Sequence, residues 1–239
     1  MGIHTTEAIV LRRYPFRETS VIVNCLTPDF GKLKGLVKGL RAQPNRYRSA
    51  MEPFTINRIV FYDTRTSPLH LITQCDLVAP LSELPRDLEV MRTAAAATHL
   101  IDAVVPLEEP HAAVYGLFKH TLECLSLGGH PLALQTHFIA RLLRLAGFQP
   151  QLDQCVGCTA RVHSTGYWSV RQGGLLCPQC LHEDPRAEPA SRGMLEAIET
   201  LSQADQPPAI DPALLPTLRS RLDEFLRWRL DRPFKTVTT

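Results

Sequence analysis

Two matched cysteine pairs limit what this chain can fold into. They read CVGC at residues 155–158 and CPQC at residues 177–180, with eighteen residues between them. Two-residue spacing lets a tight turn direct both thiolates at one ion, and two such turns complete a tetrahedral sulfur site. Thiolates without oxygen ligands favour zinc over magnesium or calcium. We therefore predict one structural Zn²⁺ ion, bound by Cys155, Cys158, Cys177 and Cys180.

The alternatives for these cysteines are a pair of disulfides or four unrelated buried thiols. The N-terminal residues have no apolar core of a signal peptide, and the longest apolar runs are far below the ~20 residues of a membrane helix. A cytoplasmic location is expected, and it disfavours disulfides. YWSV, GG and LL between the pairs predict two short strands joined at Gly173-Gly174, the layout of a zinc ribbon. Cys25, Cys75 and Cys124 lie in apolar segments and are expected to be core residues.

The first 80 residues have the pattern of a small β-barrel. Short segments rich in β-branched and apolar residues alternate with turn clusters such as TPDFG and DTRTSP. The predicted strands are 7–13, 20–27, 32–38, 52–63 and 69–77. A five-stranded OB-type barrel accounts for them best, because closure removes most exposed strand edges.

Basic residues are concentrated in this N-terminal part. Residues 1–80 hold eleven Lys or Arg against six Asp or Glu, whereas the remainder holds fifteen against eighteen. The segment 31–48, GKLKGLVKGLRAQPNRYR, carries six Lys or Arg and no acid. Strand alternation predicts Lys32, Lys34, Leu36 and Lys38 on one face and Leu33, Gly35 and Val37 on the other. This charge pattern indicates a polyanion-binding module, with a merely solvated basic surface as the alternative.

Catalytic motifs do not fit the chain. GKLKG is not a phosphate-binding P-loop, because Leu33 replaces the Ser or Thr that would hold magnesium. The zinc-deaminase, H-E-x-x-H and G-x-S-x-G patterns are also missing from the sequence. We therefore predict no catalytic residues.

After about residue 84 the apolar spacing becomes helical. Helices are expected within 85–105, 111–129, 132–148, 191–203 and 212–230. In the first of them, Leu88, Met91, Ala95 and Leu100 form the expected apolar stripe. The predicted organisation is an OB domain at 1–80, a helical domain at 81–150 and 187–239, and an inserted four-cysteine ribbon at 151–186. The fold class is therefore α+β and multidomain.

Several of these segments resemble the RecO family of bacterial DNA repair proteins. The likeness covers the whole length and is carried by VLRR, RET at 17–19, the T…GK turn, KGLR at 38–41, MEPF at 51–54, the four-cysteine insertion and the closing RWRLDRPFKT. It implies a non-enzymatic recombination mediator that binds single- and double-stranded DNA and anneals complementary strands. It also implies work with RecR, sometimes with RecF, contact with the acidic tail of the single-stranded DNA-binding protein, and help in loading RecA.

The basic stretch agrees with that task, because cations that neutralise backbone phosphates bind DNA by releasing counterions. The expected phosphate contacts are Lys32, Lys34, Lys38, Arg41, Arg46 and Arg48, extended by Arg12, Arg13 and Arg17. Tyr47 is expected to stack on a base. Arg141 and Arg144, one helical turn apart, are candidates for an acidic partner peptide. An RNA- or ribosome-associated barrel protein and a metal-dependent enzyme are the alternatives.

Overall fold

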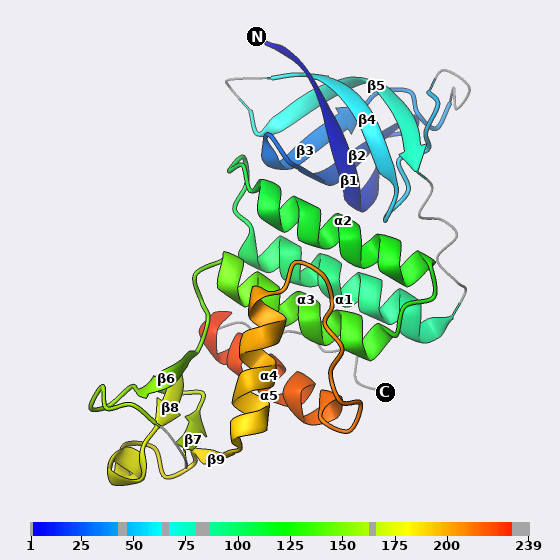
Figure 1. Cartoon of the computed structure of the whole chain (residues 1–239). Coiled ribbons are helices and arrows are strands. Elements are labelled where there is room, and N and C mark those ends of the chain that lie inside the picture. The colour runs from blue at the N-terminus through cyan, green and yellow to red at the C-terminus, as the bar shows by residue number, and fades with distance from the viewer. Residues whose placement is uncertain (1, 43–46, 64–66, 80–86, 163–165, 231–239) are drawn as a thin grey trace. The chain divides into compact units, whose positions relative to one another are not determined.

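A computed structural model describes residues 2–42, 47–63, 67–79, 87–162 and 166–230 of the 239-residue chain (Figure 1). The chain forms two compact units, Met1–Gly129 and His130–Thr239. The first unit contains the barrel and two helices, and the second contains three helices and the four-cysteine segment. The unit boundary thus falls between two helices; the boundaries expected at residues 80, 150 and 186 stay a prediction.

The barrel of the first unit is closed and has the OB-type strand order β1-β2-β3-β5-β4. Its strands are β1 (Ile3–Phe16), β2 (Ser20–Thr27), β3 (Gly31–Val37), β4 (Ile56–Tyr62) and β5 (Leu69–Ala79). All neighbouring strands are antiparallel except β3 and β5, which pair in parallel and close the barrel. The five predicted strands and the OB-type fold are confirmed.

Strand β3 has the predicted alternation. Leu33, Gly35 and Val37 are buried in the barrel core, whereas Lys32 and Lys34 point outward. Gly35 is needed there, because a Cβ atom would lie 2.2 Å from Cδ1 of Ile72. The expected position of Lys38 on the same strand is wrong, since β3 ends at Val37 and Lys38 begins a turn.

Helices α1 (Leu88–Val104) and α2 (Ala112–Ser126) complete the first unit. Asp87 caps α1 by accepting a hydrogen bond from the main-chain N–H of Glu89. Helix α2 buries Val114, Leu117, Phe118, Thr121, Leu122 and Leu125 on one face. The stripe expected for α1 is wrong at Leu88 and Met91, which are 61% and 40% exposed, and right at Leu100, which is buried. The true buried face contains Val90, Ala94, Ala97 and Ile101. With 3.6 residues per turn, Leu88 lies nearly opposite Val90.

Ionic contacts attach these helices to the barrel. Asp102 of α1 binds Arg12, whose Nε lies 2.7 Å from Oδ2, and Lys32, whose Nζ donates at 2.6 Å to the Asp102 carbonyl. Glu7 of β1 accepts from the Tyr115 hydroxyl at 2.6 Å and from Lys119 Nζ at 2.7 Å, both on α2. Two helices are therefore fixed to two strands, β1 and β3, by charged side chains that are partly shielded from water.

The connection between α1 and α2 also contacts the barrel. The Glu108 N–H donates to the Lys32 carbonyl at 3.0 Å, and Leu107 forms a parallel bridge with Lys32. Gly31 makes this approach possible, because a Cβ atom there would lie 2.0 Å from the Glu109 carbonyl oxygen. Its φ of +65° also falls in the left-handed region that favours glycine.

In the second unit, α3 (Pro131–Leu145) contacts α4 (Arg192–Gln203) and α5 (Leu215–Leu230). A four-stranded sheet in the order β6-β8-β7-β9 lies between α3 and α4 in the sequence. Its strands are β6 (Gln151–Cys155), β7 (Gly166–Ser169), β8 (Gly174–Leu176) and β9 (Glu188–Ala190), with a 3-10 helix, η3 (Pro178–Glu183). The predicted hairpin of β7 and β8 is present, and the two flanking strands were not foreseen.

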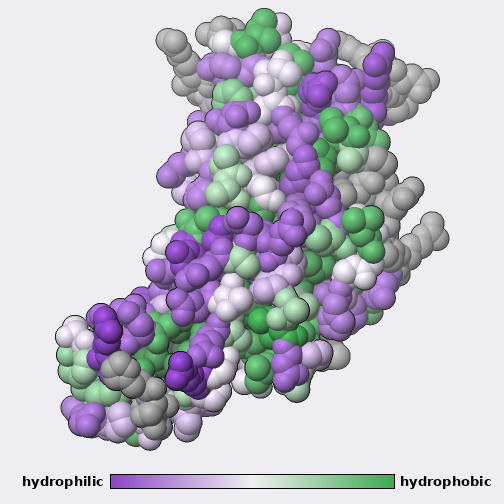
Figure 2. All heavy atoms as spheres, in the orientation of Figure 1, coloured by the Kyte–Doolittle hydropathy of each residue, from purple (hydrophilic) through white to green (hydrophobic). Residues whose placement is uncertain are grey.

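Helix α5 packs on this sheet through aromatic rings. The centroids of Trp168 on β7 and Phe225 on α5 lie 5.6 Å apart. On the face shown in Figure 2, hydrophobic residues gather only in small groups between hydrophilic ones. Among the described residues, no helix is long and apolar enough to cross a membrane.

The contact between Gly31 and the helix connection yields a stability prediction. Alanine at Gly31 should cost roughly 1–2 kcal/mol for the left-handed backbone and about 1–3 kcal/mol more for the clash with Glu109. Gly39 is the matched control, because its φ is +76° but nothing lies within 4 Å of an added Cβ. Urea unfolding followed by circular dichroism should rank Gly31→Ala clearly below Gly39→Ala. Equal losses would contradict the packing of the connection on β3.

Candidate nucleic-acid interface and metal centre

Three arginines line a hollow of about 560 Å³ at one end of the barrel. They are Arg13 near the end of β1, Arg41 in the turn after β3, and Arg48 in the segment before β4. Leu40, Tyr47 and Leu77 also line it. Residues far apart in sequence thus bring three of the predicted phosphate contacts to one place.

Two hydrogen bonds from Arg41 to main-chain carbonyls link this hollow to the β1–β2 turn. The Arg41 N–H donates to the Thr19 carbonyl at 2.8 Å, and Arg41 Nη1 donates to the Arg17 carbonyl at 3.4 Å. Arg17 has a φ of +53°, and its guanidinium lies 5.2 Å from the centroid of the Phe16 ring. Arg17 and Arg41 are therefore neighbours, held by two turns that meet at the same barrel end.

Tyr47 does not present its ring at the surface as expected for base stacking. The residue is 8% exposed and belongs to the barrel core, and its hydroxyl donates to the Lys38 carbonyl at 2.7 Å. Burial of a large aromatic ring with a satisfied hydroxyl is the usual arrangement of a core tyrosine. Here the contact fixes the turn that carries Lys38 and Arg41.

The remaining barrel cations differ in how strongly they are paired. Arg48 has a side chain 87% exposed and a loose contact of 3.9 Å with Asp76. Arg13 pairs with Glu52 at 3.2 Å. Lys34 faces outward from the middle of β3, opposite Asn24 of β2. Arg46 lies outside the described residues.

Arg12 and Lys32 are the cations most strongly engaged within the unit. Both bind Asp102, and Arg12 Nη2 also lies 3.2 Å from Nδ1 of His99. A hydrogen bond with Tyr14, with help from Asp102, raises the pKa of Arg12. Burial lowers the pKa of Lys32, and Asp102 opposes that change. The structure therefore separates these two cations from the group at the barrel end.

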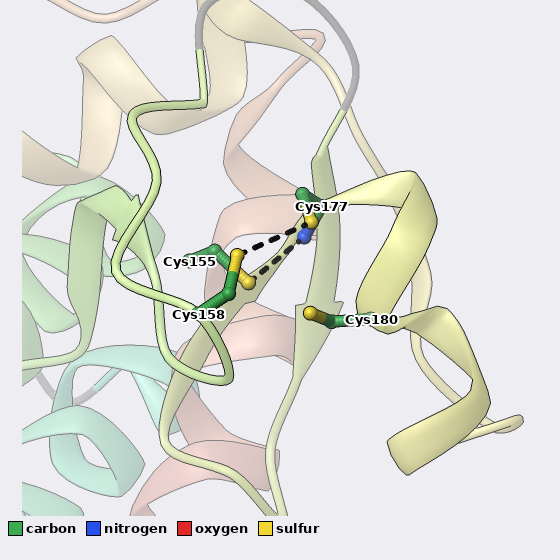
Figure 3. Close-up of side chains that lie close together, drawn as sticks. All are labelled: Cys155, Cys158, Cys177 and Cys180. Carbon is green, nitrogen blue, oxygen red and sulfur yellow. Dashed lines mark hydrogen bonds between the residues drawn. The ribbon is translucent and has the colours of Figure 1, made fainter.

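The four cysteines lie together in the second unit, and Figure 3 shows their side chains converging from two segments. Cys155 ends β6, Cys158 follows in its turn, Cys177 follows β8, and Cys180 lies in η3. All four sulfur atoms lie within 4.8 Å of one another, and Sγ of Cys158 and Cys177 are 3.7 Å apart. A tetrahedral ion with Zn–S bonds of about 2.3 Å needs sulfur atoms about 3.8 Å apart. The predicted cluster is confirmed, and its geometry can hold a metal ion.

Local hydrogen bonds favour the thiolate form of one of these cysteines, Cys155. Burial alone would raise the pKa of Cys155, but main-chain N–H groups, foremost that of Cys177, outweigh it and lower the pKa to about 6. The Cys177 N–H lies 3.3 Å from Sγ of Cys155. N–H groups that point at a sulfur favour the thiolate, which is the form that binds metal.

Of the three cysteines predicted to be core residues, Cys25 and Cys75 are buried and Cys124 is only half-buried. Cys25 and Cys75 are buried in the barrel, and burial raises the pKa of each to about 12, far from a nucleophile's range. Cys124 is half-buried, with Sγ 3.4 Å from Nε2 of His120.

The two arginines proposed for a partner peptide differ in availability. Arg141 donates to the Ser202 carbonyl at 2.9 Å and to Asp205 at 2.6 Å, so it joins α3 to the end of α4. Arg144 is exposed and borders a cavity of about 250 Å³ with Leu143 and Ile198.

Together, the OB-type barrel with cations at one end, the helices and the four-cysteine sheet define a modular protein of the class that combines a nucleic-acid-binding type of barrel with a metal-binding ribbon. Residues 1–81 match the family model described as recombination protein O N terminal, and residues 85–237 match the model for its C terminal part. The chain belongs to the RecO family of DNA repair proteins.

Curated relatives agree along most of the chain. The DNA repair protein RecO of Desulforamulus reducens is 29% identical over 99% of this chain and 93% of its own length. The RecO of Symbiobacterium thermophilum is 32% identical over 86% of this chain and 82% of its own. That of Koribacter versatilis is 35% identical over 72% of this chain and 70% of its own. The resemblance seen in the sequence is confirmed.

The cluster geometry predicts what loss of two sulfur ligands would do. Replacing Cys155 and Cys158 by Ser should abolish metal binding and lower the melting temperature by at least about 10 °C, because structural zinc contributes directly to folding. Elemental analysis and thermal unfolding would measure both effects.

Cys124→Ser is the matched control, since that thiol lies outside the cluster. Retention of one metal ion per chain in the double variant would contradict the assigned ligands.

Proposed function

We propose that this RecO-family protein is a non-enzymatic DNA repair and recombination mediator. It binds single- and double-stranded DNA without sequence preference, anneals complementary strands and helps load RecA together with RecR. Family membership supports the general role, and the cations of the barrel end support the mode of binding. The chain is expected to act in the cytoplasm, at the nucleoid.

The carrying observation is the grouping of Arg13, Arg17, Arg41 and Arg48 around one barrel end, with Lys38 in the adjoining turn. Each cation that contacts a phosphate releases a condensed counterion, so binding is strong at low salt and insensitive to base sequence. Neutralising both strands in this way also reduces their mutual repulsion during annealing.

The remaining predicted contacts are expected to contribute to DNA binding to different degrees. Lys34 extends the surface along β3, and Arg46 follows Arg41 in the sequence. Arg12 and Lys32 reach a phosphate only by exchanging Asp102 for it, so they contribute less. Tyr47 supports the turn of Lys38 from inside the barrel rather than stacking on a base.

The metal is proposed to be one Zn²⁺ ion with a structural role. Four sulfur ligands fill a tetrahedral zinc site and leave no position for water or substrate. The surrounding sheet has little core of its own, since the buried cluster there consists of Cys155, Leu176, Cys177 and Cys180. Zinc would hold the two halves of the ribbon together.

Protein partners follow from the family. RecR, and in some cases RecF and RecA, are expected to bind this chain. The acidic tail of the single-stranded DNA-binding protein is proposed to approach Arg144, beside a cavity that both polar and aliphatic side chains line. Arg141 joins that contact only if the tail displaces Asp205.

Salt titration of DNA binding tests the function. The double reversal Lys34→Glu with Arg41→Glu should weaken binding of a fluorescent single strand about 10- to 100-fold at low salt and reduce the salt slope by about 2, one per lost phosphate contact. Duplex DNA of any sequence should respond alike.

Arg92→Glu with Arg192→Glu is the matched control, because it changes the charge equally on exposed ion-paired helix positions. Equal affinity of both double variants and the wild type would contradict the barrel-end surface. Preference for RNA in competition with DNA of the same sequence would favour an RNA- or ribosome-associated role. Chemical conversion of the DNA strand in the presence of free divalent cations would instead favour a metal-dependent enzyme.

A further inference from the structure

The opposite end of the barrel contains a cavity of about 660 Å³ within the first unit. The strand registers place it there, since Ile3 at the start of β1 pairs with Tyr62 at the end of β4, far from Arg13 and the β1–β2 turn. The residues that give the cavity its chemistry are His4, Phe30, Phe61, Asp63, His70 and Glu108.

Aromatic rings form one continuous group in this cavity. The ring centroids of His4 and Phe30 lie 4.9 Å apart, those of Phe30 and Phe61 5.2 Å, and those of Phe61 and His70 5.4 Å. The face of an aromatic ring carries partial negative charge and attracts cations. Phe61 and His70 are buried, so the half-buried rings of His4 and Phe30 are the ones that offer a flat cation a stacking surface.

Carboxylates line the cavity. Asp29, Asp63 and Glu108 line it, whereas no Lys or Arg does among the described residues. Asp63 lies 3.7 Å from Nε2 of His4, and Glu108 lies 3.2 Å from Nε2 of His70. Three carboxylates repel phosphate, so this end does not suit the DNA backbone.

The fold holds Glu108 in place at a conformational cost. Glu108 has a φ of +59°, which is strained for a residue with a side chain, and its N–H is bound to the Lys32 carbonyl. Strained residues of this kind cluster at ligand sites. In addition, Nδ1 of the buried His70 ring has no hydrogen-bond partner among the described residues.

We propose that this cavity binds an arginine side chain of a protein partner. A guanidinium is flat, always charged and able to donate paired hydrogen bonds to carboxylates while it stacks on aromatic rings. An ammonium lacks the flat face and the paired donors. This site goes beyond DNA binding and does not depend on it, and it lets the barrel hold a protein and a nucleic acid at opposite ends.

The test adds N-acetyl-arginine amide to the full chain. Binding is monitored in ¹H–¹³C NMR spectra of protein labelled at histidine and phenylalanine. Saturable shifts of His4, Phe30, Phe61 and His70 are expected. N-acetyl-citrulline amide, which has the same shape without the charge, should bind at least tenfold more weakly, and so should the lysine analogue. Equal binding of the three probes, or binding of dGMP in place of arginine, overturns the proposal.

The double variant Asp63→Asn with Glu108→Gln should bind N-acetyl-arginine amide at least tenfold more weakly than the wild type. The control variant Glu109→Gln, whose side chain does not line the cavity, should bind this probe with unchanged affinity. Unchanged binding in the double variant also overturns the proposal. Should that variant melt early, the arginine–citrulline comparison on the wild type decides alone. DNA affinity, measured in parallel, should stay at the wild-type value, which separates this site from the proposed function.

Discussion

The arrangement of the first unit depends on one set of contacts, in which Asp102 of α1 and the α1–α2 connection bind to the barrel at β3. Asp102 binds Arg12 and Lys32, and the Glu108 N–H bonds to the Lys32 carbonyl. This contact fixes α1 on the barrel, pairs two cations with the Asp102 carboxylate and presents the Glu108 carboxylate to the cavity. One acidic residue therefore decides which part of the basic stretch faces solvent and which part holds the fold together.

Local patterns in the sequence were enough to predict the five barrel strands and the four-cysteine cluster. The alternation of Leu33 and Val37 with outward residues, and the two-residue spacing of Cys155 and Cys158, both involve residues that are close together in the sequence. Such patterns can be seen without knowledge of the fold. Contacts across long separations could not be predicted. Lys32 meets Asp102 seventy residues away, which no local pattern records.

The other differences between the predictions and the structure arise because residues that were expected at the surface are buried, or the reverse. Tyr47 follows a polar loop, yet its ring fills the barrel core, because the hydroxyl finds the Lys38 carbonyl. In α1, small alanines rather than Leu88 and Met91 face inward, and size alone suggested the wrong side. The cavity residues were missed altogether, since His4, Phe61 and Glu108 come together only when the barrel closes.

The parallel pairing of β3 with β5 has a consequence for how the barrel folds. Strands β1, β2 and β3 form successive antiparallel pairs, and β4 and β5 form another, so both halves assemble from near neighbours. Joining β3 to β5 must wait for a long loop to close, and such pairings are slow. Until then β3 is an open edge, and its outward lysines, Lys32 and Lys34, are the residues that discourage two unfinished chains from pairing there. Lys32, which holds Asp102 in the finished protein, and Lys34, which is proposed to contact DNA there, thus also protect the chain before the barrel closes.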